Sequence, residues 1–234
     1  MQTVLEILQS IGVFGAGVLA RFGLFLAMMA VFFVPAIAIA LAIRGASSRR
    51  ERALGVRDVG GVPFRPDLAY AAGHVWLHPR PGGRAHELGL DGLAQRLLTG
   101  VSAVETARPG TRVSRGDTIA TLHGGNRALA IPAPFDGTVL GVNSAVVRDP
   151  QLVKRDPFGR GWLVAIAPDD GAEGRLARGP EAEAWTRREA HRWNAFLEQQ
   201  LGFASADGGA LVAPAPWLVG EEGWQALSDA FLKT

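Results

Sequence analysis

Residues 121–139, TLHGGNRALAIPAPFDGTV, decide the fold. Two apolar, strand-like runs flank the turn GGNR at 124–127, and glycine and asparagine suit such a turn because they tolerate left-handed backbone conformations. The pair Asp136-Gly137 is a second turn signal and predicts a tight hairpin before the next strand. The stretch is therefore expected to form a β-hairpin with Asn126 at its exposed tip.

The sequence on both sides of this hairpin predicts further short strands. Residues 69–79 alternate apolar and polar side chains as a strand does, and residues 86–107 read as a strand, a short helix around Leu90–Leu97 and another strand. Gly110 and Gly116 mark turns that need a positive φ or a missing side chain. The fold class is therefore α+β and mainly β, a compact barrel or sandwich with C-terminal helices. The first of these helices is expected over 179–201, with its large apolar residues near one face: Trp185, Ala190, Trp193, Phe196 and Leu197.

A long apolar run precedes this domain. Residues 22–43, FGLFLAMMAVFFVPAIAIALAI, hold no charged side chain, and as a helix they would rise about 33 Å, enough for a hydrocarbon core of about 30 Å. We expect a retained transmembrane helix. A cleaved signal peptide is the alternative, but the run is long and arginine follows it instead of a small-residue cleavage site. Arginines gather after the run, which predicts a single-pass protein of the inner membrane with residues 45–234 in the cytoplasm: Arg44, Arg49, Arg50, Arg52 and Arg57.

The predicted organisation has five parts. Residues 1–21 form an N-terminal segment that either makes a short interfacial helix or extends the membrane helix. Residues 22–43 span the membrane and residues 44–66 form a linker. Residues 67–200 form the β-rich domain, and residues 201–234 are a C-terminal extension.

The composition excludes several classes of function. The chain of 234 residues has no cysteine, which rules out disulfides, thiolate metal sites and thiol nucleophiles. The 24 basic and 22 acidic residues nearly balance, and no nucleic-acid motif is present, so no nucleic-acid partner is expected. No nucleophile elbow, phosphate loop or pair of catalytic carboxylates stands out. The five histidines follow no metal-ligand pattern. We therefore expect a protein that is not an enzyme and has no metal site and no cofactor.

The ordered motifs resemble the H protein of the glycine cleavage system and, more broadly, the lipoyl/biotinyl domain. The resemblance covers about residues 67–200, and three segments carry it: AGHVWL at 72–77, PGTRVSRGD at 109–117, and the stretch 133–168, which contains DPFGRGWL. The resemblance implies a β-rich fold whose hairpin carries lipoate on a lysine, through an amide bond.

The lysine that this resemblance implies is missing. Counting back from the proline before Asp136-Gly137 places Asn126 at the attachment position. Neither its amide nor the guanidinium of Arg127 is a nucleophilic amine, so neither accepts a lipoyl group. No lysine occurs before Lys154, which lies in the loop before DPFGRGWL, and His123 and two glycines replace the acidic residue that commonly precedes the family lysine.

The whole hairpin is therefore expected to be a degenerate lipoyl site that binds no cofactor: His123, Gly124, Gly125, Asn126 and Arg127. His123 and Arg127 are interpreted as part of a solvated turn. Binding of an acidic partner through these two side chains is the alternative.

The C-terminal extension is interpreted as a docking element. Apolar residues gather there, and we expect them to contact a partner, with docking on the chain's own domain as the alternative: Trp217, Leu218, Trp224, Leu227 and Phe231. The last three follow helical spacing.

The expected function is that of a non-catalytic accessory subunit. One helix would anchor it in the lipid bilayer, and its cytoplasmic domain would pack on other subunits of a larger bioenergetic membrane complex. A photosynthetic reaction centre–antenna complex is the suggested host, and a respiratory complex or a membrane hydrogenase is left open. The alternative function is an acyl or aminomethyl carrier, or a dehydrogenase-docking protein, of the glycine cleavage type.

Overall fold

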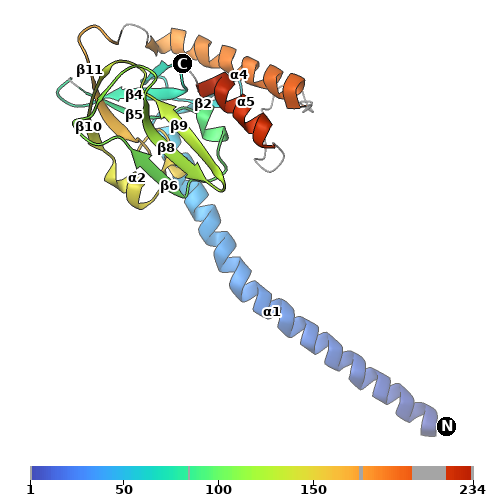
Figure 1. Ribbon diagram of the computed structural model, residues 1–234. Helices are drawn as coiled ribbons and strands as arrows, with labels where there is room; N and C mark the ends of the chain where they lie inside the picture. The colour runs from blue at the N-terminus through green and yellow to red at the C-terminus, as the bar shows by residue number, and fades with distance from the viewer. Residues whose placement is uncertain (1, 84, 174–175, 202–219, 233–234) are drawn as a thin grey trace. The chain divides into compact units, whose positions relative to one another are not determined.

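A computed structural model describes residues 2–83, 85–173, 176–201 and 220–232 (Figure 1). The chain divides into two compact units, Met1–Arg49 and Arg50–Thr234.

The first unit is helical. Helix α1 runs over Gln2–Ala53, so its last residues belong to the second unit. Within α1, the stretch Ala20–Ala42 is long and apolar enough to cross a membrane, with a mean hydropathy of 2.7 and no part of it buried. A signal sequence near an N-terminus shares this length and composition. The large side chains of the stretch are exposed, as Phe32 illustrates at 72%, and apolar surface of this extent is stable in lipid but not in water.

The structure bears on two predicted parts of the chain. Residues 2–21 extend the apolar helix, which is one of the two predicted alternatives, because α1 is continuous from Gln2. Residues 44–66, predicted as a linker, contain regular secondary structure. Helix α1 continues to Ala53, and the following residues pair as the hairpin β1 (Arg57–Val59) and β2 (Val62–Phe64). Burial of Val59 and Phe64 ties this hairpin to the second unit.

The second unit is built on antiparallel sheets. The larger sheet has the strand order β12-β3-β4-β5-β11-β10-β7, and the smaller sheet has the order β6-β8-β9. The strands of the larger sheet are β3 (Ala69–Ala71), β4 (Val75–Pro79), β5 (His86–Leu90), β7 (Arg112–Val113), β10 (Gly137–Val142), β11 (Val164–Pro168) and β12 (Ala177–Arg178). Those of the smaller sheet are β6 (Ala103–Thr106), β8 (Thr118–Gly124) and β9 (Arg127–Pro132). The mainly β fold class is confirmed.

Short helices and two longer ones complete the unit. The 3₁₀-helix η1 (Ala94–Arg96) and helices α2 (Ser144–Arg148) and α3 (Leu152–Arg155) lie in the loops, whereas α4 (Gly179–Leu201) and α5 (Glu221–Leu232) follow the sheets. The helix expected over 179–201 is confirmed, and Trp193 and Ala190 on its predicted apolar face are buried. One large cluster of aliphatic side chains from both sheets includes residues of α4 and α5, and a smaller aromatic cluster surrounds Trp76.

Two turn predictions need correction. Residues 69–79 are not one strand, because Gly73 and His74 have φ values of 84° and 56° and turn the chain between β3 and β4. Asp136-Gly137 does not form a hairpin turn, because β9 and β10, on either side of it, belong to different sheets. Glycine is needed at 137 for close approach, since a Cβ there would lie 2.2 Å from the carbonyl oxygen of Ala167.

Candidate functional site

The hairpin predicted around Asn126 is present. Strands β8 and β9 pair antiparallel, and the pair Gly124–Arg127 closes a two-residue turn of Gly125 and Asn126. Gly125 has a φ of 62°, a conformation in which glycine is unstrained. Asn126 is exposed. The backbone therefore presents residue 126 to solvent, with a carboxamide as its reactive group.

The base of this turn is held by a neighbouring loop. A Cβ at Gly124 would lie 2.2 Å from the carbonyl oxygen of Gly100, so the strand and the loop touch at this glycine. Ser102 donates through both its backbone N–H and its hydroxyl to the carbonyl oxygen of His123. Packing on this loop fixes the end of β8.

The two charged residues of the hairpin have partners within the domain. The Nε2 atom of His123 lies 3.2 Å from a carboxylate oxygen of Glu105 on β6. The guanidinium of Arg127 lies 4.7 Å from the ring centroid of Trp224 on α5, within cation–π range. The interpretation of both as part of a solvated turn therefore needs correction, since each side chain contacts a neighbouring element.

Helix α5 lies beside the hairpin, with contacts to β9 (Figure 1). Trp224, Leu227 and Phe231 are 6%, 1% and 3% exposed, so these three side chains are buried in their own domain. The C-terminal extension was expected to contact either a partner or its own domain, and in the structure α5 packs on its own domain. A partner contact through these side chains stays a prediction that would require α5 to leave the domain. Trp217 and Leu218 lie outside the described residues.

An aromatic cluster joins α5 to α4. The ring of Phe231 lies 5.0 Å from that of Trp193 and 5.8 Å from that of Phe196, both edge-on. The guanidinium of Arg192 lies 4.7 Å from the same ring and donates a hydrogen bond to the carbonyl oxygen of Ala230. Phe231 is therefore the central contact between the two C-terminal helices.

A groove of about 490 Å³ separates α5 from the hairpin strands. Outward-facing small residues of β8 and β9 line one side, and mixed polar and apolar residues of α5 line the other: Thr118, Ala128, Ala130, Trp224, Gln225 and Asp229. Its lining does not include Asn126. The groove therefore lies along the flank of the hairpin and not at its tip.

A buried histidine links the sheets to the C-terminal helices. The Nδ1 atom of His74 lies 2.8 Å from a carboxylate oxygen of Asp91, and its Nε2 lies 3.5 Å from a carboxylate oxygen of Glu189 on α4. The same Glu189 oxygen lies 3.0 Å from Arg192 Nη1. The imidazole, 2% exposed, also lies 5.9 Å from Phe231 between ring centroids. His74 thus contacts three parts of the domain: Asp91 after β5, Glu189 on α4 and Phe231 on α5.

The charge of His74 follows from these neighbours. Burial alone lowers its pKa, but the charge and hydrogen bond of Asp91 and those of Glu189 outweigh burial and raise the pKa of His74 to about 9. Partial burial raises the pKa of Glu189, and the hydrogen bond and charge of His74, with Arg192, bring that pKa below its usual value. The group is therefore an imidazolium between two carboxylates at neutral pH.

Lys154 is the one lysine among the residues that the structure describes, and its amine already has hydrogen-bond partners. Its Nζ donates to the carbonyl oxygens of Gln95 and Leu98, the latter at 2.8 Å. Burial, with the nearby charge of Arg96, lowers the pKa of Lys154 to about 8. The amine lies at the loop that supports the hairpin, not at its tip. The residues present at the tip therefore do not fit an amide-linked lipoyl group.

The candidate site is thus an exposed two-residue hairpin on a domain of antiparallel sheets. Residues 68–188 match the family "Glycine cleavage H-protein". The chain belongs to the glycine cleavage H-protein family.

Individual relatives show the same match. The chain is 39% identical over 107 residues to the glycine cleavage system H protein of Pseudoalteromonas atlantica, covering 46% of this chain and 82% of that protein. It is 40% identical, with the same coverage, to that of Alteromonas mediterranea. A crystal structure of the H protein from Mycobacterium marinum matches with 27% identity and a TM-score of 0.46, covering 53% of this chain and 99% of the other. The family match ends before the last turns of α4 and before α5, so these elements lie outside the matched residues.

Proposed function

We propose that this chain is a membrane-anchored, non-catalytic accessory subunit that has kept the fold of a lipoyl carrier and lost the carrier chemistry. One observation carries the proposal: the hairpin is intact, with a two-residue turn at the expected place, and its tip is Asn126. An amide cannot form the amide bond through which the family carries lipoate. The packing of helix α5 on β9 supports the same conclusion, because it places an additional helix beside the strand that follows the hairpin tip.

A domain without carrier chemistry keeps its capacity to bind other proteins. The apolar stretch Ala20–Ala42 supports an anchor in the membrane, and an anchored binding domain suits a subunit of a membrane complex. Membership of the H-protein family does not point to photosynthesis or to electron transport, so the host complex is to be identified by co-purification in mild detergent from native membranes.

The first test is the mass of the protein from its native host. We expect the mass of the unmodified chain, because no amine is presented at the hairpin tip. Asn126→Ala should leave both the mass and the co-purifying proteins unchanged, since the side chain is exposed. The matched control is Asn126→Lys, which places an amine at the same exposed position. This variant shows whether a lipoylating enzyme still recognises the hairpin. A wild-type mass higher by one lipoyl group would contradict the proposal and favour the carrier alternative.

The second test is the topology. Arginines follow the apolar stretch and only Arg21 and the amino terminus precede it, so we expect the second unit in the cytoplasm. Protease added to inside-out vesicles should digest this unit, and right-side-out vesicles should protect it. Digestion only in right-side-out vesicles would reverse the orientation. Recovery of a shortened, soluble chain would identify the apolar stretch as a cleaved signal sequence.

A further inference from the structure

Two exposed arginines of the second unit, Arg50 and Arg155, form ion pairs with carboxylates. The Nε atom of Arg50 lies 2.9 Å from Asp156 Oδ2, and the same carboxylate oxygen accepts a hydrogen bond from the backbone N–H of Arg160 at 3.0 Å. Arg155 forms an ion pair with Asp149, the residue after Arg148. These contacts bring the end of α1, helices α2 and α3, and the loop after α3 to one surface. We call Arg50, Arg148, Arg155 and Arg160 the arginine face.

The arginine face has an excess of positive charge directed to solvent. Two of its four guanidinium groups, those of Arg50 and Arg155, pair with carboxylates. Arg148 Nε donates to the carbonyl oxygen of Ser144 at 3.2 Å. The side chain of Asp156 is 10% exposed, whereas that of Arg50 is 49% exposed. Arg148 and Arg160 are exposed as well. Beside Arg148, Val147 on α2 is 48% exposed, one of the few large apolar side chains exposed in this unit. Basic and apolar side chains also occur together on helices that lie on a bilayer surface.

The chain itself limits how far this surface is from the apolar stretch. The candidate span ends at Ala42, and α1 continues without a break to Ala53. The helical residues between Ala42 and Arg50 rise about 12 Å, whatever the orientation of the two units. The headgroup layer on one side of a bilayer is roughly 5–8 Å thick. Arg50 therefore stays near the headgroups if the stretch spans the membrane.

We propose that the arginine face binds the headgroups of anionic phospholipids. This inference rests on the proposed membrane anchoring. The guanidinium group matches a phosphate in charge and in its planar pair of donors, and the cytoplasmic leaflet is the anionic one. An acidic protein surface would also complement the arginines, but the short helical connection to the apolar stretch favours the lipid.

The test uses the full chain in nanodiscs made of phosphatidylcholine with a fixed fraction of phosphatidylglycerol. Native mass spectrometry measures which lipid remains bound after the disc is disrupted. Each basic side chain near an anionic surface is worth about fivefold in binding, so the ratio of phosphatidylglycerol to phosphatidylcholine retained by the wild type should be at least roughly tenfold above the ratio in the disc. In the triple variant Arg148→Gln, Arg155→Gln, Arg160→Gln, the retained ratio should fall to that of the disc.

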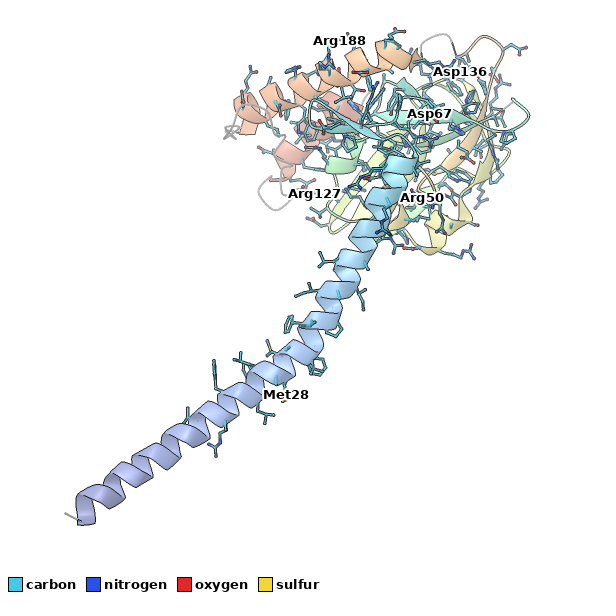
Figure 2. The ribbon with its side chains drawn as sticks, turned by 180° about the vertical axis from the view of Figure 1, so that it is seen from behind. Met28, Arg50, Asp67, Arg127, Asp136 and Arg188 are labelled. Atoms are coloured by element: carbon cyan, nitrogen blue, oxygen red, sulfur yellow. The ribbon has the colours of Figure 1, made fainter. Side chains whose placement is uncertain are left out.

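The matched control removes the same charge elsewhere. Arg112→Gln, Arg187→Gln, Arg188→Gln changes three exposed arginines of β7 and α4 and should retain phosphatidylglycerol as the wild type does. Arg188 and Arg50 lie on different sides of the second unit (Figure 2). Thermal unfolding of each variant confirms that the fold is kept.

Three outcomes would overturn the inference. Equal retention of both lipids by the wild type would show that the arginine face does not select anionic lipid, and would favour an acidic protein as its partner. Equal loss of phosphatidylglycerol in the triple variant and in its control would show that the retention depends on the net charge of the protein and not on the arginine face. A wild-type chain that does not enter nanodiscs would overturn the membrane anchoring itself, which separates that failure from a failure of lipid selectivity in a chain that does enter.

Discussion

Phe231→Ala is expected to lower the free energy of unfolding of the second unit by about 3–5 kcal/mol, the cost of truncating a fully buried phenylalanine. Phe231 is 3% exposed and lies in edge-on contact with Trp193 and Phe196. The substitution leaves a cavity between α4 and α5 and removes the ring beneath the Arg192 guanidinium. Urea unfolding of the full chain in detergent, followed by tryptophan fluorescence, measures the change.

The control for this prediction lies on the same helix. Gln225 is exposed, and its side chain donates only to Asp229 one turn later, so Gln225→Ala should cost within about 0.5 kcal/mol. If Phe231→Ala left the stability of the isolated chain unchanged but abolished co-purification of other subunits, α5 would be a partner-binding helix, as the sequence first suggested. Loss of stability with assembly retained would assign the aromatic residues of α5 to the chain's own fold.

The hairpin was predictable from sequence because its determinants are local. Glycine and asparagine at 124–126 fix the turn, and the apolar runs on either side fix β8 and β9. The chemistry of the tip was equally local, since it depends on one side chain at one position. The hairpin prediction at Asp136-Gly137 was wrong because a glycine is needed both in tight turns and where two backbones approach closely. The sequence does not distinguish these two roles, since the backbone that approaches Gly137 belongs to Ala167.

The contacts made by the C-terminal helices were not predictable from local pattern. The spacing of Trp224, Leu227 and Phe231 predicts an amphipathic helix but not the surface that it covers. That surface is composed of β9 and α4, which lie far away in sequence. His74 was missed for the same reason, since its partners Asp91 and Glu189 are brought together only by the fold. Its φ of 56° gives no sequence signal, although the glycine before it does indicate a turn.

His74→Asn is expected to remove the fall in stability that His74 contributes as the pH rises from about 6.5 to 9. The pKa of His74 rises from 6.5 to about 9 on folding. Below pH 6.5 the imidazole is protonated in both states and the stabilisation is fully present. Between the two values the unfolded chain releases its proton while the folded chain keeps it, so stability falls as pH rises, and above about pH 9 the contribution is lost. A difference of this size corresponds to about 3 kcal/mol.

Asparagine is the informative replacement because it tolerates the left-handed backbone that residue 74 adopts, so the variant removes the cation without adding backbone strain. Lys154 acts in the opposite sense. Its pKa falls to about 8 on folding, so it favours the folded state increasingly as pH rises above that value. The quantity to measure is therefore the difference in unfolding free energy between wild type and His74→Asn at each pH, in which the effect of Lys154 cancels. A flat difference for His74→Asn would show that the buried imidazole is neutral, and that hydrogen bonding and packing, not charge, join α4 and α5 to the sheets.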